Sequence, residues 1–267
     1  MTPVTEKPRF MTIIQARMGS TRLPGKVMKD LAGKPVLWHI ANRVKQSSLS
    51  YAVVVATTTN SEDDIIESAC HLWNVPVFRG SPENVLERFC GAVQFMESGK
   101  PTTDYIIRIT GDCPLIDPTV IDEVARVALS GRYDYASNTN PPTFPDGLDV
   151  EVISRDVLFL ANEKATLQSE REHVTPFIKN HPFFKKYNVQ YSKDLSALRW
   201  TLDNQEDYEL IKIIYNDLFI SSKIFLMDDV LKLFLKKPEL KNINSHIKRN
   251  EGYEKSLSHD RIVRGDS

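Results

Sequence analysis

Apolar residues recur along the first half of the chain in two alternating patterns. Short runs rich in β-branched and aromatic residues predict strands, and stretches with apolar positions three or four residues apart predict helices. The predicted strands are Phe10 to Ala16, Tyr51 to Ala56, Val75 to Phe78 and Asp104 to Thr110, and helices between them are predicted at Pro35 to Gln46, Ser61 to Leu72 and after Ser81. This alternation implies right-handed crossovers, and therefore a doubly wound α/β fold with a mostly parallel sheet and helices on both faces.

The pattern changes after Tyr135, where a turn-rich segment precedes an alternating strand from Leu148 to Ile153. We interpret residues 138–153 as a small β excursion from the main sheet. Helices are predicted at Arg155 to Ala165, Glu170 to Lys179, Gln205 to Asp217 and from Asp228, and strands at Tyr187 to Tyr191 and Leu198 to Thr201. We therefore divide the chain into a main domain over residues 1–227 and a C-terminal helix with a polar tail over residues 228–267.

The composition narrows the classes of partner. The chain has 267 residues and 41% hydrophobic content, enough for a core, while 34 basic against 35 acidic residues give no electrostatic reason to expect nucleic acid or an anionic membrane. Residues 1–8 lack the apolar stretch of a secretion signal, and no run approaches the roughly 18 to 20 apolar residues that span a bilayer. Because Cys70, Cys90 and Cys113 show no CxxC spacing, a reduced cytoplasmic location is expected.

A basic, glycine-containing loop follows the first predicted strand, where doubly wound sheets bind their ligands. Glycines let backbone N–H groups approach an anion, and nearby cations neutralise phosphate charge. An ordinary surface loop could share this composition, but its place at the strand end favours triphosphate binding. The sequence lacks GxxxxGK[ST] and GxGxxG, which argues against a P-loop ATPase and a dinucleotide dehydrogenase. The candidate residues of the loop are Ala16, Arg17, Gly19, Ser20, Arg22 and Lys26.

Two aspartates are candidate metal ligands. Asp112 follows the fourth predicted strand, so it should project toward the basic loop, and a carboxylate facing a triphosphate suggests Mg²⁺. Asp112 could equally form a turn before Pro114. Asp203 could supply a second carboxylate, but Asp203 with Glu206 also has the spacing of an N-cap and capping box for the following helix. Spacing alone leaves both readings of Asp203 open.

Two further groups are candidates for binding an acceptor. Asp149 and Glu151 share one face of an alternating strand and could bind sugar hydroxyls or a metal, although the solvated face of an edge strand would look the same. His173, at the start of a predicted helix, could meet an acceptor carboxylate or phosphate, although a lone histidine is more often structural. The histidines show no HxxxH or HExxH spacing, and no GxSxG motif is present, which argues against a zinc site and a serine hydrolase.

Together these motifs resemble the cytidylyltransferase family that activates 3-deoxy-octulosonate and acylneuraminate sugars, most closely its spore-coat polysaccharide (SpsF-type) branch. The resemblance covers most of the chain. It rests on the segments Ile14 to Lys26, Val55 to Thr58, Phe78 to Phe89, Thr110 to Leu115, Asp149 to Val152, Glu172 to Thr175, Arg199 to Asp203, Ile243 to Ile247 and Asn250 to Ser256.

The resemblance implies a Rossmann-like nucleotide-diphospho-sugar transferase fold, CTP as donor and a homodimer. It favours Asp112 and Asp203 as joint Mg²⁺ ligands, with Arg17 and Lys26 as further catalytic residues. Thr57, Thr58 and Arg79 would complete the nucleotide pocket. The acceptor side would contain Asp149, Glu151, His173 and Arg199.

The sequence therefore predicts a magnesium-dependent enzyme that transfers CMP from CTP to a sugar-acid or sugar-like acceptor and releases pyrophosphate, for surface polysaccharide or glycan synthesis. Residues 138–145 do not clearly match the acceptor-binding elements of the named sugar enzymes, so the acceptor stays unidentified. One alternative is a nucleotidyltransferase with another base or a sugar-phosphate acceptor. Another is a non-catalytic nucleotide-binding subunit of a polysaccharide pathway, against which the presence of both Asp112 and Asp203 argues.

Overall fold

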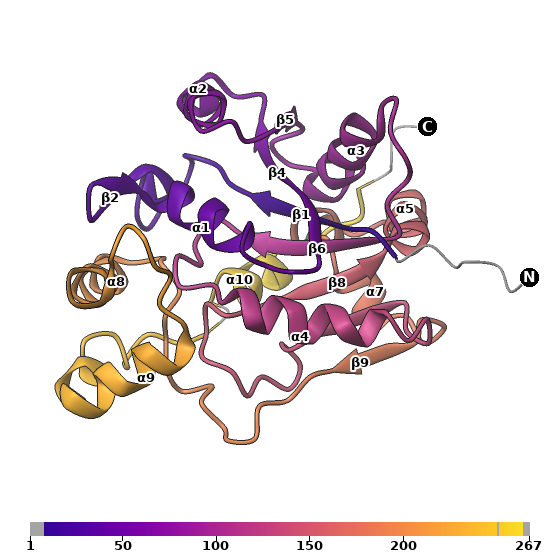
Figure 1. Cartoon of the computed structure of the whole chain (residues 1–267). Helices are drawn as coiled ribbons and strands as arrows, with labels where there is room; N and C mark the ends of the chain where they lie inside the picture. Colours follow the sequence, from indigo (N-terminus) through magenta and orange to yellow (C-terminus); the bar gives the residue numbers. More distant parts are fainter. Residues whose placement is uncertain (1–7, 250, 264–267) are drawn as a thin grey trace, which may run out of the picture.

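Parallel strands form the centre of the sheet in the computed structural model, which describes residues 8–249 and 251–263 (Figure 1). The described part of the chain contains a seven-stranded sheet in the order β5-β4-β1-β6-β8-β7-β9, in which β8 runs antiparallel to both of its neighbours. This confirms the predicted mostly parallel sheet. The strands are β1 (Phe10–Gln15), β4 (Ser50–Thr58), β5 (Val77–Gly80), β6 (Tyr105–Thr110), β7 (Tyr135–Ser137), β8 (Glu151–Ser154) and β9 (Lys186–Asn188).

Helices cover both faces of the sheet, as the doubly wound pattern requires. Along β1, Phe10 and Ile14 enter the core beneath α1, α4, α8 and α9, whereas Met11 and Ile13 enter the core beneath α3, α5 and α7. Figure 1 shows α3 and α5 on the opposite side of the sheet from α8 and α9. The helices are α1 (Val36–Val44), α2 (Asp64–Leu72), α3 (Val85–Glu97), α4 (Pro118–Ala128), α5 (Arg155–Lys164), α6 (Gln168–His173), α7 (Pro176–Asn180), α8 (Gln205–Leu218), α9 (Met227–Lys236) and α10 (Glu251–Ser258).

Short elements complete the described structure. They are a two-stranded ribbon of β2 (Asp30–Leu31) and β3 (Lys34–Pro35), and the 3₁₀ turns η1 (Lys26–Met28), η2 (Ser61–Asp63) and η3 (Pro238–Asn242). Among the helices of residues 8–249 and 251–263, none has the length and apolar character that a membrane span requires.

The order of strands reverses between β1 and β6, which creates a crevice at their carboxyl ends. From β1 the chain adds β4 and then β5 on one side, and returns to place β6 on the other side. The N–H of Gly111 donates to the carbonyl of Gln15 over 2.8 Å, and a Cβ on Gly111 would lie 2.8 Å from the same oxygen. Only glycine allows this approach, which brings the loops after β1 and β6 side by side.

The excursion after Tyr135 differs in detail from the prediction. The strand expected at Leu148 to Ile153 pairs only from Glu151 onward, although Leu148 and Val150 are fully buried as the alternation predicts. The side chain of Asn138 explains the late start, because it donates to the carbonyl of Leu148 over 2.8 Å and accepts from the N–H of Val150 over 2.9 Å, in place of a neighbouring strand.

Two other predicted elements are wrong as stated. The strand expected at Leu198 to Thr201 is an irregular segment, joined to the rest by an isolated bridge between Arg199 and Asp146. The helix expected at Glu170 to Lys179 is broken into α6 and α7, because Val174 between them adopts a φ of 70° that no α-helix contains.

The polar C-terminal tail forms more structure than its pattern predicts. The helix expected from Asp228 is α9, but η3 and α10 follow it, and Ile262 then forms a bridge with Leu167 at the start of α6. In Figure 1, α10 is drawn near the middle of the molecule, and it packs against α6. Ionic and hydrogen-bonded contacts, described below, hold this segment, so hydrophobic periodicity could not reveal it.

Candidate functional site: a charged cavity at the carboxyl ends of β1 and β6

A cavity of about 920 Å³ lies where the loops after β1 and β6 meet. This is the position that the doubly wound topology predicts for a ligand. Residues from α6, α7, the excursion and the C-terminal segment complete its wall. The predicted residues that the structure brings together here are Ala16, Arg17, Gly19, Ser20, Arg22, Lys26, Asp112, Asp149, Glu151, His173, Arg199 and Asp203.

Hydrogen bonds within the chain shape the basic loop after β1. The N–H groups of Ser20 and Gly25 both donate to the carbonyl of Met18, over 2.7 and 3.1 Å, and Gly25 has a φ of 66° that favours glycine. The N–H of Met18 donates to the buried carboxylate of Asp63 over 2.7 Å. The loop therefore turns back on itself beside β1 and carries its cations along the cavity wall.

Lys26 joins the two aspartates that the sequence singles out. Its Nζ lies 2.9 Å from Oδ2 of Asp112 and 2.6 Å from Oδ1 of Asp203. Burial opposes the charge of Lys26, but the two carboxylates outweigh it and raise the pKa of the ammonium. Burial likewise opposes the charge of Asp112, yet Lys26 and a hydrogen bond from Thr110 lower its pKa to about 2. Lys26 and Asp112 are therefore both charged at neutral pH.

The structure decides between the two interpretations of Asp203. The N-cap of α8 is Asn204, and Asp207 closes the capping box by accepting from the N–H of Asn204 over 2.9 Å. Asp203 precedes the cap, so its side chain is available to the cavity, where it also lies 2.9 Å from Nη2 of Arg22. The capping interpretation of Asp203 and Glu206 is therefore wrong by one position, and Asp203 as a metal ligand stays a prediction.

Arg88 is a cavity residue that the sequence analysis missed. It lies on α3 with a 3% exposed side chain, donates to the carbonyl of Ser81 over 2.7 Å, and its Nε has no partner among the described residues. Burial, and then the charge of Arg17, lower its pKa to about 10. Burying a cation without a carboxylate partner costs free energy of folding, and a polar or anionic ligand would offset that cost by binding this guanidinium. Its signal in the sequence is a charge at the helical spacing of the buried Val85 and Ala92.

Three residues expected in the nucleotide pocket lie outside the cavity wall. Thr57 and Thr58 are buried at the end of β4, and Thr58 hydrogen-bonds to Asp63 and so supports the basic loop indirectly. Arg79 instead forms ion pairs with Asp64 and Glu67 on α2, over 2.6 and 2.8 Å. In the structure these three residues therefore contact neighbouring parts of the protein and do not line the cavity.

Glu151 lines the acceptor side of the cavity, but its carboxylate is fully engaged by the protein. It accepts from Lys179, Tyr135 and Thr175 over 2.6, 2.5 and 2.9 Å and pairs with Arg108. Burial opposes its charge, but Lys179 and Arg108 outweigh burial and lower the pKa of Glu151. Because Tyr135, Thr175 and Lys179 share one of its oxygens and Arg108 pairs with the other, Glu151 mainly orients the two cations around it.

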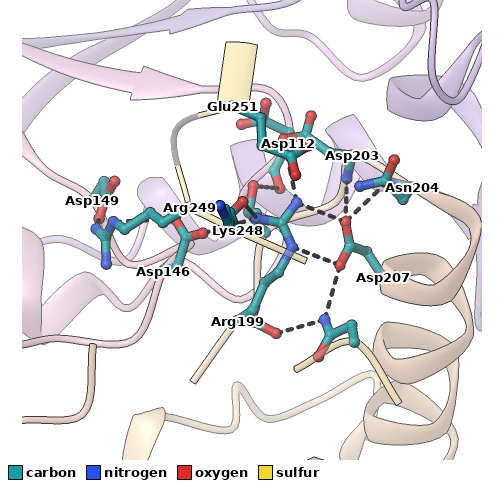
Figure 2. A network of polar contacts seen from close by, with 12 residues as sticks. Asp112, Asp146, Asp149, Arg199, Asp203, Asn204, Asp207, Lys248, Arg249 and Glu251 are labelled. Carbon is teal, nitrogen blue, oxygen red and sulfur yellow. Dashed lines mark hydrogen bonds and ion pairs between the residues drawn. The ribbon is translucent and has the colours of Figure 1, made fainter. Parts of the chain in front are cut away.

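Arg199 also touches the cavity but is committed to the protein interior. Nε and Nη2 each lie 2.9 Å from the carboxylate of Asp207, and Nη1 lies 3.1 Å from Asp146, as Figure 2 shows. Arg199 is 6% exposed and the side chain of Asp207 is completely buried. The bidentate pair ties the segment before α8 to α8 itself, and the contact with Asp146 ties it to the excursion. Arg199 therefore shapes the acceptor side and has few donors left for a ligand.

Asp149 and His173 are the predicted acceptor-side residues with the most capacity for a ligand. One oxygen of Asp149 accepts from Arg249 over 2.5 Å. Burial raises the pKa of Asp149, and burial followed by the charge of Asp149 raises the pKa of Asp146 to about 7. His173 Nε2 is buried and has no hydrogen-bond partner among the described residues.

No group of three or more histidine, cysteine or carboxylate side chains that could hold a metal occurs within residues 8–249 and 251–263.

Comparison with known proteins gives a family model and relatives that match this chain. Residues 11–247 match the family model described as cytidylyltransferase. The chain is 39% identical over 216 residues to the spore coat polysaccharide biosynthesis protein SpsF of Bacillus subtilis. The aligned region covers 77% of this chain and 86% of that protein.

Two solved structures share the fold. A cytidylyltransferase from Leptospira borgpetersenii superimposes with a TM-score of 0.81 and 33% identity, over 87% of this chain and 96% of that one. A CMP:2-keto-3-deoxy-manno-octonic acid synthetase solved with CTP superimposes with a TM-score of 0.59 and 19% identity, over 79% of this chain and all of that one. At 19% identity the second comparison supports the Rossmann-like fold alone.

Proposed function

The chain belongs to the cytidylyltransferase family, and on that premise we propose that it transfers CMP from CTP to a sugar-acid or sugar-like acceptor in the synthesis of a surface polysaccharide or glycan. The observation that carries the proposal is the convergence of Asp112 and Asp203 on Lys26 beside the basic loop, within one cavity. Such a site places cations and carboxylates together where a triphosphate would bind.

We propose Mg²⁺ as the cofactor, held by Asp112 and Asp203. The two carboxylates approach a single point, the ammonium of Lys26, and hard oxygen donors in this number suit magnesium, which takes one or two carboxylates together with phosphate oxygens and waters. When bound, the ion would supply positive charge next to the phosphates.

The residues of the chain would act mainly by positioning and by charge. The acceptor oxygen forms a bond to the α-phosphorus as the bridging oxygen leaves with pyrophosphate, and the hydroxyl proton passes to solvent. Arg17, Arg22 and Lys26 lie where they can bind the β- and γ-phosphates, and so stabilise the leaving pyrophosphate. Asp149 and His173, which also line the cavity, would contact the acceptor.

Pyrophosphate release tests the proposal. The protein is incubated with CTP, UTP, ATP or GTP and Mg²⁺, together with a panel of octulosonates, nonulosonates and sugar phosphates. We expect release with CTP and at least one sugar acid, and none in EDTA. Release that depends on a different base, or on a sugar 1-phosphate, would replace the proposed specificity, and CTP binding without release would favour a non-catalytic subunit.

Replacing Arg88 tests whether this cavity residue contributes to nucleotide binding. Arg88→Met is expected to weaken CTP binding about 10- to 100-fold, since a hydrogen bond to a charged group contributes about 1.5 to 3 kcal/mol. Stability should be unchanged or higher, because the variant removes a buried cation that has no carboxylate partner. Calorimetric titration and urea unfolding measure the two effects.

Arg79→Met is the matched control, because Arg79 is paired with Asp64 and Glu67 outside the cavity. Its affinity for CTP should stay within about twofold of wild type. If Arg79→Met loses CTP binding and Arg88→Met keeps it, the expectation drawn from the sequence is right and the assignment of Arg88 is wrong.

We further propose a homodimer and a cytoplasmic location, both of which rest on the family resemblance and the sequence composition. Light scattering tests the first: a monomer mass at working concentration would contradict it. Cell fractionation tests the second.

A further inference from the structure

The C-terminal segment lines the cavity although it follows the part of the chain that the family model matches. That match ends at residue 247, whereas Lys248, Arg249, Glu251, Gly252 and Tyr253 all contribute to the cavity wall. Residues 250–256 resemble the spore-coat branch in sequence, but the matched domain itself does not include the residues that follow 247 on the cavity wall.

Contacts on both sides of Glu251 hold the segment in place. Before it, Arg249 pairs with Asp149 over 2.5 Å and approaches Asp146 to 3.7 Å. After it, Asp260 accepts from the N–H and hydroxyl of Ser169 over 2.9 and 2.6 Å. Glu251 is thus presented to the cavity from a segment tied down at both ends, which keeps its effective concentration there high.

Glu251 forms an ion pair with Arg22, a cation that a triphosphate would bind. Its Oε2 lies 3.2 Å from Nη1 of Arg22, while Nη2 of Arg22 lies 2.9 Å from Asp203. Figure 2 shows Glu251 beside Asp112 and Asp203, above the network around Arg199. The side chains of Arg22 and Glu251 are 35% and 43% exposed, so this pair can separate without opening the core.

We propose that Glu251 competes with the triphosphate for Arg22 and thereby sets the affinity of the site for its nucleotide. The inference rests on the proposed function, because it assumes that the phosphates of CTP bind the basic loop. The negative charges of a carboxylate and a triphosphate repel each other when both bind one guanidinium. The other terminal nitrogen of Arg22 is already paired with Asp203. Glu251 must therefore leave Arg22 when the nucleotide binds.

The size of the effect follows from the exposure of the pair. A ligand that binds only the open arrangement has its apparent affinity reduced by the fraction of molecules that are open. For a partly exposed ion pair in a tethered segment, removing the competing charge should tighten CTP binding by about three- to tenfold. Isothermal titration calorimetry can measure a change in CTP affinity of this size.

The test compares two charge-removing variants of one helix. Glu251→Gln removes the negative charge that pairs with Arg22, and Glu254→Gln removes an equal charge from an exposed position of α10 that is not part of the cavity wall. CTP binding to the wild type and both full-length variants is titrated in Mg²⁺ at 0.15 M salt, with circular dichroism as a check on folding. Glu251→Ala repeats the measurement without an amide in place of the carboxylate.

We expect Glu251→Gln and Glu251→Ala to bind CTP about three- to tenfold more tightly than wild type, with Glu254→Gln within about twofold. Unchanged or weaker binding by the Glu251 variants would overturn the inference and leave the proposed function standing. Equal tightening by Glu254→Gln would also overturn it, because the effect would then be general charge repulsion. Failure of the wild type and all variants to bind CTP would overturn both the inference and the proposed function.

Discussion

Asp112→Ala should lower kcat by at least about 10² to 10³, the loss that typically follows removal of a preorganised charge-stabilising group. Asp112 is one of two carboxylates that meet at Lys26, and its pKa of about 2 keeps it charged at any working pH. Its removal takes away one of the two proposed magnesium ligands and leaves Lys26 with Asp203 alone. Steady-state kinetics with CTP and the acceptor found in the pyrophosphate screen measure the loss.

Two variants separate chemistry from folding in this experiment. Asp112→Asn keeps the shape of the side chain and removes its charge, so it should lose nearly as much activity as Asp112→Ala. Asp156→Ala removes a 97% exposed aspartate away from the cavity wall and should leave kcat within about twofold. Near-normal turnover by a folded Asp112→Ala protein would contradict the assigned role.

Arg199→Met should have the largest effect on stability, a loss of about 3 to 5 kcal/mol in the free energy of unfolding. Removing the guanidinium leaves the completely buried carboxylate of Asp207 without its cation, and leaves Asp146 with only Arg249, 3.7 Å away. An uncompensated buried charge is the reason for the size of the loss. Urea denaturation followed by circular dichroism measures it.

Arg79→Met is the natural comparison for Arg199→Met. Arg79 also has two carboxylate partners, but Asp64 and Glu67 are 60% and 36% exposed, so its loss should cost less than about 1 kcal/mol. If the two variants are equally stable, the buried network around Arg199 does not have the structural role assigned to it. A large rise in KM for the acceptor without loss of stability would restore the ligand-binding role that the sequence suggests.

The sheet and the place of the site were predictable because they depend on regular patterns. Alternating strand and helix periodicities require a parallel sheet, and the topology of such a sheet places ligands beyond its carboxyl edge. The basic loop and Asp112 follow β1 and β6 directly, so their proximity needs no knowledge of side-chain contacts. The role of Asp203 could not be settled in this way, because a shift of one residue decides whether Asp203 or Asn204 caps α8.

Other features could not be predicted because contacts between distant segments create them. Arg199 is a cationic residue in an irregular segment, and only the fold shows that Asp207 and Asp146 enclose it. Arg88 lies among apolar residues of α3, and only the folded structure shows that it lines the cavity. The C-terminal segment packs through ion pairs and hydrogen bonds, which leave no periodic hydrophobic signal.

The central claim is that this cavity joins CMP from CTP to an acceptor, and phosphorus NMR of the products tests it most directly. The protein is incubated with CTP, Mg²⁺ and the acceptor identified by pyrophosphate release. We predict that the CTP resonances are replaced by one equivalent of pyrophosphate and one equivalent of a phosphodiester that joins CMP to the acceptor. Formation of CDP or inorganic phosphate in place of pyrophosphate and the phosphodiester would contradict the account.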